Sequence, residues 1–336
     1  WRRAVCGWFL RRHGLEVDPA WLIFATGVVP ILSSVVRKLT TPNENVLLLT
    51  PVYNIFYNSI VNNGRRPLEV PLIYEGGAYR IDFDALEAGL ADPQTTLMIL
   101  CNPHNPVGKI WDRDTLAGIG SLAARYHVVV VSDEIHCDLT DPGRSYVPFA
   151  SVSEECRRNC VVCFAPTKTF NLAGIQTAGA MVLDPFLRHR VWRALNTDEV
   201  AEPNVFAMPA AVAAYTHGDE WLDALRAYLF ENKRTVQRYL AERLPGVLPV
   251  AGEATYLLWL DCSAYTGDSA GLAAEIRSRT GLYLSDGVQY GRGGEHFLRM
   301  NIACPRARVL DGLETTLKNC RLYYQWHRKE EADAPT

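Results

Sequence analysis

The sequence predicts an α/β protein with a mostly parallel sheet in a large domain, followed by a smaller C-terminal α/β domain. Three observations lead to this prediction. From residue 20 to about residue 185, short apolar or β-branched runs alternate with stretches of helical periodicity. The runs are apolar nearly throughout, which is typical of parallel strands that helices cover on both faces. Past residue 184 the rhythm changes to longer helical stretches, and a chain of 336 residues is long enough for two domains.

The first region is expected to alternate strands with helices. Val5, Phe9 and Leu10 have helical spacing, so a helix is also expected before the first strand. Because nothing before Trp1 can cap that helix and no initiating Met is present, we expect an upstream segment to be missing. The expected strands are Leu22–Ala25, Val46–Leu49, Pro67–Val70, Leu97–Cys101, Val128–Ser132, Val161–Phe164 and Ala178–Val182. The expected helices between them are Ile31–Lys38, Tyr53–Asn62, Phe83–Leu90 and Thr115–Tyr126.

The second region is expected to begin with long helices and to end in a small α/β unit. We place the large domain at residues 1–215, the small domain at 216–325 and a disordered, charged tail at 326–336. The expected helices are Pro185–Leu195, Val205–Thr216, Trp221–Leu244 and Arg306–Cys320. The expected strands are Tyr256–Leu260, Leu282–Leu284 and Phe297–Asn301.

Composition excludes several classes of partner. A formal net charge of −3 with dispersed Lys and Arg provides no basic field for nucleic acid and no polybasic patch for a membrane. The longest apolar runs, such as Val128–Val131, are far shorter than the roughly 20 residues of a membrane span. The nine cysteines are scattered, and nothing near Cys156 and Cys160 completes a zinc pattern. We therefore expect reduced thiols, a cytoplasmic protein, and no metal site.

Two motifs at strand ends suit the binding of an anion. Gly27 lies between an expected strand and an expected helix, where free N–H groups at the helix start suit a phosphate. A simple turn is the alternative, and alone it is the commoner one. Asn105 lies in the string NPHNPVGK after another strand, where two Asn-Pro pairs favour a rigid turn that holds its amide at the strand end. The alternative is that this loop has only a structural role and binds no ligand.

Two further motifs place charged groups at strand ends. Asp133, in SDEIH, follows a buried strand, and a buried acid requires a cationic partner such as a protonated pyridine nitrogen. A helix N-cap is the alternative for Asp133. Lys168, in PTKTFN, lies in an apolar loop that favours the neutral amine, which Schiff-base chemistry requires. A surface position is the commoner fate of a single lysine.

The order of these four features favours one shared site, because ligands of such sheets lie outside the carboxyl ends of the strands. The strings NPHNPVGK, SDEIH, PTKTFNLAG and FLRMNIACP together resemble the fold-type I, aminotransferase class I/II superfamily of pyridoxal-5′-phosphate (PLP) enzymes. They look most similar to the cystathionine β-lyase (C–S lyase) branch. The resemblance runs from about residue 1 to residue 322 and implies the aspartate-aminotransferase-like fold.

The resemblance also implies a role for each matching residue. Lys168 is expected to form the Schiff base with PLP and to move the Cα proton of the substrate. Asp133 is expected to pair with the pyridine nitrogen, and Asn105 to bind the pyridine 3-oxygen beside the substrate. Arg299 is expected to bind the substrate carboxylate, which suits a bidentate guanidinium. Tyr53 is expected to stack on the ring, and a core residue is the alternative for it. The remaining expected cofactor ligands are His136 and the phosphate-binding residues Gly27, Val28, Val29 and Thr167.

The sequence departs from the family pattern at several points. His136 stands where aminotransferases have Tyr, as in the β-lyase branch, and Gln176 stands where they have an arginine for the phosphate. Thr167 replaces the commoner Ser and keeps the hydroxyl group. An N-terminal segment whose tyrosine reaches the partner subunit's phosphate in the family is absent from this sequence.

The expected function is that of a PLP-dependent C–S β-lyase. It would convert L-cystathionine or an S-substituted L-cysteine into a thiol, pyruvate and ammonia. Return of the proton to the cofactor would instead make the chain an aminotransferase, and His136 favours the lyase. A PLP-binding regulatory protein is the alternative from another class.

The resemblance further implies a homodimer. The N-terminal helix and the Tyr53–Asn62 helix carry more apolar surface than one domain face needs. We therefore expect a partner surface formed by Trp8, Phe9, Phe56 and Tyr57. Packing inside the large domain is the alternative for these four residues.

Overall fold

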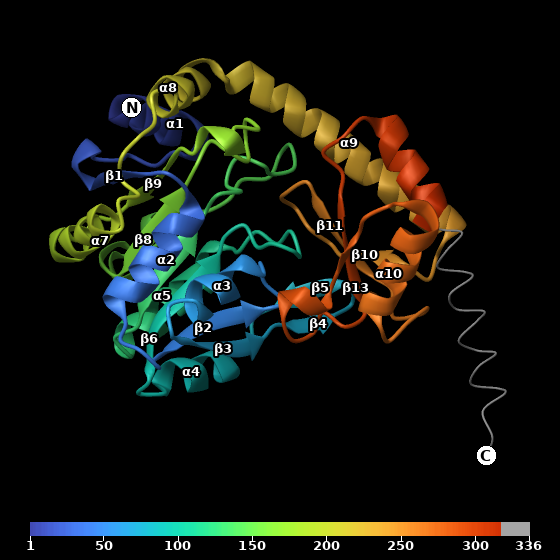
Figure 1. Ribbon diagram of the computed structural model, residues 1–336, viewed down its shortest axis with the longest axis horizontal. Coiled ribbons are helices and arrows are strands. Elements are labelled where there is room, and N and C mark those ends of the chain that lie inside the picture. Colours follow the sequence, from blue (N-terminus) through green and yellow to red (C-terminus); the bar gives the residue numbers. More distant parts are fainter. Residues whose placement is uncertain (317–336) are drawn as a thin grey trace.

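A seven-stranded sheet forms the centre of the larger part of the molecule (Figure 1). The computed structural model describes residues 1–316. The strand order is β1-β9-β8-β7-β6-β2-β3, in which β3, β2, β6, β7 and β8 run parallel and β9 is antiparallel to both of its neighbours. All seven expected strands are confirmed to within two residues at either end. They are β1 (Leu22–Ala25), β2 (Asn45–Thr50), β3 (Arg66–Pro71), β6 (Thr95–Cys101), β7 (Val129–Asp133), β8 (Cys160–Phe164) and β9 (Ala178–Met181).

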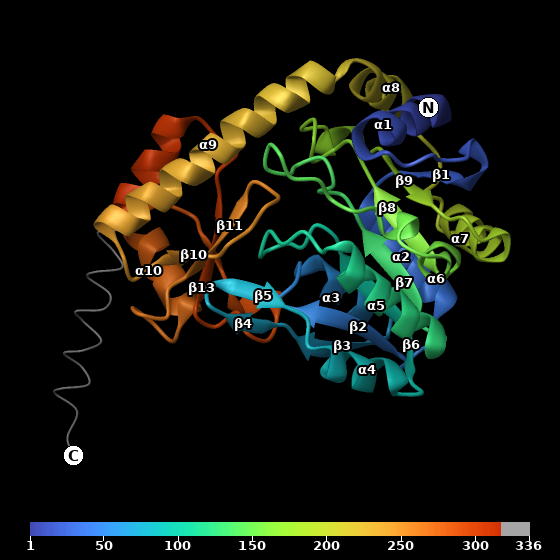
Figure 2. The same cartoon turned by 180° about the vertical axis from the view of Figure 1, so that it is seen from behind.

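Helices cover both faces of this sheet (Figures 1 and 2). Along β2, Val46 and Leu48 belong to one core cluster, whereas Leu47 and Leu49 belong to the other. Both faces are therefore buried, which explains why the strands are apolar throughout rather than alternating with polar residues. One face packs against α2 (Val28–Leu39), α3 (Ile55–Val61) and α7 (Pro185–Thr197). The other packs against α1 (Arg2–His13), α4 (Phe83–Ala91), α5 (Arg113–Arg125), α6 (Glu154–Arg158) and α8 (Ala207–His217).

Three of the four apolar residues that we expected on a partner surface, Trp8, Phe9 and Phe56, are core residues instead. Trp8 and Phe56 are fully buried, and Phe9 is 1% exposed. Tyr57 is half-buried. The face of α1 that carries Trp8 and Phe9 packs beside α8 and against the sheet (Figure 1), so that prediction was wrong and the apolar side chains complete the core of the large part.

A second sheet lies at the far end of α9 (Asp219–Arg243), the long helix that runs from α8 across the molecule (Figure 1). It has the order β10-β11-β13-β12, with antiparallel pairing throughout. Its strands are β10 (Leu248–Pro249), β11 (Leu257–Asp261), β12 (Ser285–Asp286) and β13 (Phe297–Asn301), and α10 (Ser269–Thr280) and residues 306–316, which are helical, pack beside it.

One strand of this sheet was placed wrongly from the sequence. The expected strand Leu282–Leu284 is not a strand, and the pairing residues are Ser285 and Asp286. Leu284 is 5% exposed and belongs to the core cluster beneath the sheet. The apolar pattern of this segment therefore reflects burial in that core and not strand pairing. The last residues of the expected helix Arg306–Cys320 and the expected tail 326–336 lie outside the described residues.

A hairpin that was not predicted joins the two sheets. It consists of β4 (Ile73–Glu75) and β5 (Ala78–Arg80), with Gly76 and Gly77 at positive φ in the turn. Tyr74 Oη donates to Asp261 Oδ2 (2.9 Å), and Trp259 Nε1 donates to Tyr79 Oη (3.1 Å). Both partners lie on β11, so the hairpin ties an early segment of the chain to the C-terminal sheet. No helix within residues 1–316 is long and apolar enough to cross a membrane.

Candidate active site

The predicted site residues meet at the carboxyl ends of β6, β7 and β8. In the sheet register Cys101 lies beside Asp133, and Asp133 lies beside Cys163, so the loops that follow these strands start at one edge. A cavity of about 360 Å³ opens there. Its lining includes nearly every predicted site residue, from six separate segments: Gly27, Val28, Val29, Tyr53, Asn105, Asp133, His136, Lys168 and Arg299.

Asp133 is a buried acid at the wall of this cavity. It is the last residue of β7 and is 4% exposed, and its Oδ1 accepts a hydrogen bond from the Ile135 N–H (3.1 Å). Burial raises its pKa to about 7, against the opposing effects of the Ile135 N–H and the Lys168 charge. No helix begins at Asp133, so the N-cap alternative does not apply. A cation bound in the cavity would lower this pKa and stabilise the charged carboxylate.

The next residue turns away from the cavity. Glu134 accepts hydrogen bonds from Ser132 Oγ, Tyr146 Oη and the Phe149 N–H, each at 2.9 Å. Glu134 is fully buried, and burial raises its pKa to about 7. These bonds fix the loop after β7, while Asp133 is the member of the acidic pair that faces the cavity.

His136 and Tyr53 are two uncharged rings in the cavity wall. His136 is 3% exposed, and burial lowers its pKa to about 3, assisted by the charges of Lys168 and Arg299. Its Nδ1 has no hydrogen-bond partner in the described part of the chain. Burial raises the pKa of Tyr53, and the Asp133 charge adds to this effect. Both side chains are therefore neutral near pH 7, and His136 retains an unused polar atom.

Lys168 lies in a tight loop after β8. The loop is closed by hydrogen bonds from the Phe170 N–H to the Pro166 carbonyl (2.8 Å) and from the Leu172 N–H to the Thr167 carbonyl (2.9 Å). Lys168 is half-buried and lines both the first cavity and a second one of about 400 Å³. The predicted phosphate ligand Thr167 lines the second cavity, Gly27, Val28 and Val29 line the first, and Lys168 lines both.

Arg299 lies in the middle of β13 and reaches the loop after β6. Its Nη1 donates to Asn105 Oδ1 (3.2 Å), and its Nη2 lies 3.5 Å from Ser285 Oγ. The guanidinium carbon is 4.9 Å from the centre of the Tyr290 ring. Sequence reasoning missed Ser285 and Tyr290, because only the strand pairing and the following turn bring them to Arg299.

Gly27 is the N-cap of α2, and its backbone is extended. A Cβ atom there would lie 3.1 Å from Pro30 Cδ, which is a crowded contact. The first-turn N–H groups of Val28 and Val29 have no partner within the helix, and the first turn of α2 contains no acidic residue. This end of α2 therefore presents donors and a positive dipole end to the cavity.

The fold and the site together define a class of protein: an α/β enzyme with a buried acid, an amide, a lysine and an arginine around one cavity. A family model described as aminotransferase class I and II matches residues 1–315. The chain belongs to this family.

Individual relatives are also similar over most of their length. The chain is 43% identical over 310 residues to cystathionine beta-lyase PatB of Bacillus subtilis. The alignment covers 92% of this chain and 80% of that protein. The structure matches cystalysin from Treponema denticola, which contains a pyridoxal 5′-phosphate cofactor, with a TM-score of 0.92 at 30% identity, over 95% of this chain and 81% of that one. It also matches the PLP-bound C-S lyase from Staphylococcus hominis, with a TM-score of 0.88 at 29% identity, over 95% and 82% of the two chains.

Proposed function

We propose that the chain is a PLP-dependent C–S β-lyase that converts L-cystathionine or an S-substituted L-cysteine into a thiol, pyruvate and ammonia. The observation that carries the proposal is the meeting of Lys168, Asp133 and Arg299 around one cavity in a chain that is 43% identical to a cystathionine β-lyase. A lysine, an acid and an arginine there meet the three needs of such a reaction: attachment of PLP, protonation of its ring, and recognition of a carboxylate.

The residues present fit PLP. The buried Asp133 carboxylate, with a pKa raised to about 7, suits a protonated ring nitrogen, and the unpartnered His136 Nδ1 offers a further polar contact. Asn105 would bind the 3-oxygen, and Tyr53 would stack on the ring. The N-terminus of α2 at Gly27 and the Thr167 hydroxyl would bind the phosphate. When bound, PLP supplies an electron sink that withdraws electrons from the substrate Cα.

The protein side chains divide the remaining work. Arg299 binds the α-carboxylate and so orients the amino acid over Lys168. Lys168 would then remove the Cα proton, and Asp133 would hold the proton on the ring nitrogen of bound PLP. Breakage of the Cβ–S bond releases the thiol, which takes up a proton, and water then hydrolyses the remaining fragment to pyruvate and ammonia.

Product analysis tests the proposal against the aminotransferase alternative. The chain is incubated with PLP and L-cystathionine, and thiol, pyruvate and ammonia are assayed separately, with and without an added keto acid. Equal amounts of the three products without a keto acid support the lyase. A keto acid formed only when another keto acid is added, without thiol or ammonia, identifies an aminotransferase. Bound PLP with no product favours a regulatory protein.

We also propose that the chain works as a homodimer in the cytoplasm, with a large domain at 1–215 and a small one at 216–325. The family resemblance supports the dimer, and Val205 and Phe206, which are 78% and 68% exposed in the segment after α7, are apolar candidates for its surface. The cysteines of residues 1–316 form no disulfide bonds, which supports a reducing compartment. Light scattering at micromolar concentration tests the dimer, and a stable monomer of about 38 kDa that binds PLP would contradict it.

A further inference from the structure

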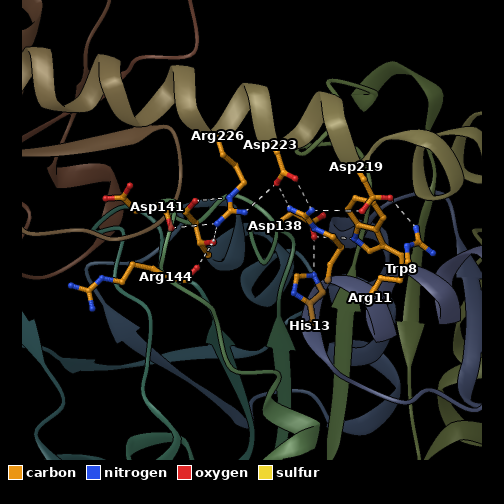
Figure 3. Close-up of polar contacts among 11 residues, drawn as sticks. Trp8, Arg11, His13, Asp138, Asp141, Arg144, Asp219, Asp223 and Arg226 are labelled. Carbon is orange, nitrogen blue, oxygen red and sulfur yellow. Dashed lines mark hydrogen bonds and ion pairs between the residues drawn. The ribbon is translucent and has the colours of Figure 1, made fainter.

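A cluster of hydrogen bonds surrounds Asp138, beside the loop that carries Lys168 (Figure 3). Asp138 is 5% exposed, and its Oδ1 accepts a hydrogen bond from Trp8 Nε1 (3.0 Å) and lies 2.8 Å from His13 Nε2. Its Oδ2 accepts a hydrogen bond from Thr169 Oγ1 (2.8 Å). Both oxygens of a buried carboxylate are thus engaged, and one of them is bound to the residue that directly follows Lys168.

The bond between Asp138 and Thr169 joins two loops that start side by side. Asp133 and Cys163 are neighbours in the register of β7 and β8, and the chain leaves the sheet after each strand. Asp138 follows Asp133 by five residues, and Thr169 follows Lys168 by one. Thr169 is fully buried. This bond therefore joins the residue after Lys168 directly to the loop that carries the buried acid.

Helices on two sides anchor Asp138 in turn. Trp8 and His13 lie on α1, and Figure 3 shows them reaching Asp138 beneath α9. Arg12 of α1 forms an ion pair with Asp223 of α9 (2.6 Å), and Arg226 of α9 donates to the Thr140 carbonyl (2.8 Å), two residues after Asp138. The Asp138 loop is thus tied to α1 and to α9.

Asp138 is also a strong hydrogen-bond acceptor. Burial by itself would raise its pKa, but the hydrogen bonds from His13, Thr169 and Trp8 hold the pKa below its ordinary value. The carboxylate is therefore ionised at neutral pH, and hydrogen bonds to an ionised group are roughly twice as strong as neutral ones.

A metal site is the other role that this cluster suggests. Among residues 1–316, His13, Cys137 and Asp138 offer ligand atoms that lie within 4.8 Å of one another. The lone pairs of Asp138 already face the indole N–H of Trp8 and the hydroxyl of Thr169, and the indole is only a donor. A cation bound to Asp138 would have to displace these donors, so the geometry favours a hydrogen-bonded anchor.

We infer that Asp138 is a positioning residue that, through Thr169, holds Lys168 in place facing Asp133 and Asn105. The inference rests on the proposed attachment of PLP to Lys168. Misplacement of a reacting group by about 1 Å can cost roughly a hundredfold in rate. The bond to Thr169 matters because it is adjacent to Lys168 in a loop that contains Asn171 at positive φ (54°) and is closed internally by short turns.

The test compares three variants. Thr169→Val removes the hydroxyl group and keeps the shape, and Thr169→Ser keeps the hydroxyl group. Thr316→Val is the matched control, because Thr316 is also buried and donates to a carbonyl, that of Gly312 (2.8 Å), on the terminal helix. For each variant, kcat and KM for L-cystathionine are measured, together with the pH midpoint of the bound cofactor's absorbance and the fraction of PLP that borohydride fixes to Lys168.

Thr169→Val is expected to lower kcat by about tenfold to a hundredfold with little change in KM, and to shift the pH midpoint of the cofactor absorbance. Thr169→Ser is expected to keep the unmodified kcat and pH midpoint. Thr316→Val is expected to change neither quantity, even where it lowers thermal stability. Thr169→Ala removes the same hydroxyl group without adding atoms, so it replaces Thr169→Val if that variant does not fold.

Two results overturn the inference, and they are distinguishable. In the first, borohydride fixes PLP on Lys168 of the unmodified protein, but Thr169→Val and Thr169→Ala have the same kcat and pH midpoint as the unmodified protein. Asp138 then does not position the lysine, and the proposed function stands. If borohydride fixes no PLP on Lys168 in the unmodified protein, the proposed function fails and the inference fails with it.

Discussion

Arg299 donates from Nη1 to the Oδ1 atom of Asn105 across 3.2 Å, which joins β13 to the loop after β6. The two residues are 194 positions apart in the sequence. Because the amide oxygen accepts from the guanidinium, the Asn105 Nδ2 donors are left for another partner. The arginine thus fixes the orientation of the amide, and a donor is the group that an oxyanion of a bound cofactor requires.

Asn105→Asp is expected to lower kcat by about tenfold to a hundredfold, since hydrogen bonds to charged groups contribute about 1.5–3 kcal/mol. The substitution replaces donors with a carboxylate that repels an oxyanion and pairs with Arg299. Steady-state kinetics with L-cystathionine measure the effect. Asn63→Asp, which changes the same group on the part-buried side chain bonded to the Ser59 carbonyl, is the control. Equal kinetics in both variants would contradict the role of Asn105.

Lys168→Ala is expected to abolish both turnover and the borohydride-stable attachment of PLP. The amine is the nucleophile that attaches the cofactor, and no shorter side chain can replace it. Peptide mass spectrometry after borohydride reduction locates the attachment. Lys109→Ala, in the NPHNPVGK loop, is the control and should retain the label on Lys168. A label that persists in Lys168→Ala would identify a different lysine as the site.

Arg299→Ala is expected to raise KM for amino acids by about a hundredfold, because it removes a charge-assisted contact to the α-carboxylate. The absorbance of the bound cofactor should change little. Comparison of an amino acid with its carboxamide provides an independent check, because the unmodified protein should discriminate strongly against the carboxamide. Equal turnover of the two compounds would contradict recognition by Arg299.

The contribution of Asp133 to the stability of the cofactor-free protein is expected to fall as the pH rises from about 4 to about 7. Burial raises the pKa of Asp133 from 3.8 to about 7, so the folded protein holds a proton there that the unfolded chain releases. The stabilisation is fully present below the unfolded pKa and is lost as the pH rises through the folded pKa. Its size is a few kcal/mol at most, since one pKa unit corresponds to about 1.4 kcal/mol.

Urea denaturation at several pH values, without PLP, measures this dependence. Asp133→Asn removes the titrating group, so the free energy of unfolding of the unmodified protein should fall relative to that of the variant as the pH rises. Glu134 titrates in the same direction and remains in both proteins, so the difference between the two curves isolates Asp133. Parallel curves would show that folding does not raise the pKa of Asp133.

The sequence by itself determined the parallel sheet and most of the site. Strands buried on both faces are apolar throughout, so their positions can be read from local composition. Because the carboxyl ends of such strands lie at one edge, residues at or shortly after those ends lie around one cavity, as Asn105, Asp133 and Lys168 do.

Only the tertiary structure decided the features that depend on pairing between distant segments. The register of β12 and β13 brings Ser285 beside Arg299. Leu284 packs in the core beneath that sheet although it pairs with no strand, so its apolar side chain reflects burial and not a strand. Trp8 was expected on a partner surface, but its indole donates to Asp138 in the core, 130 positions further along the chain. An apolar side chain has the same sequence signal in a core and in an interface, because both exclude water, and only the fold determines which of the two surrounds it.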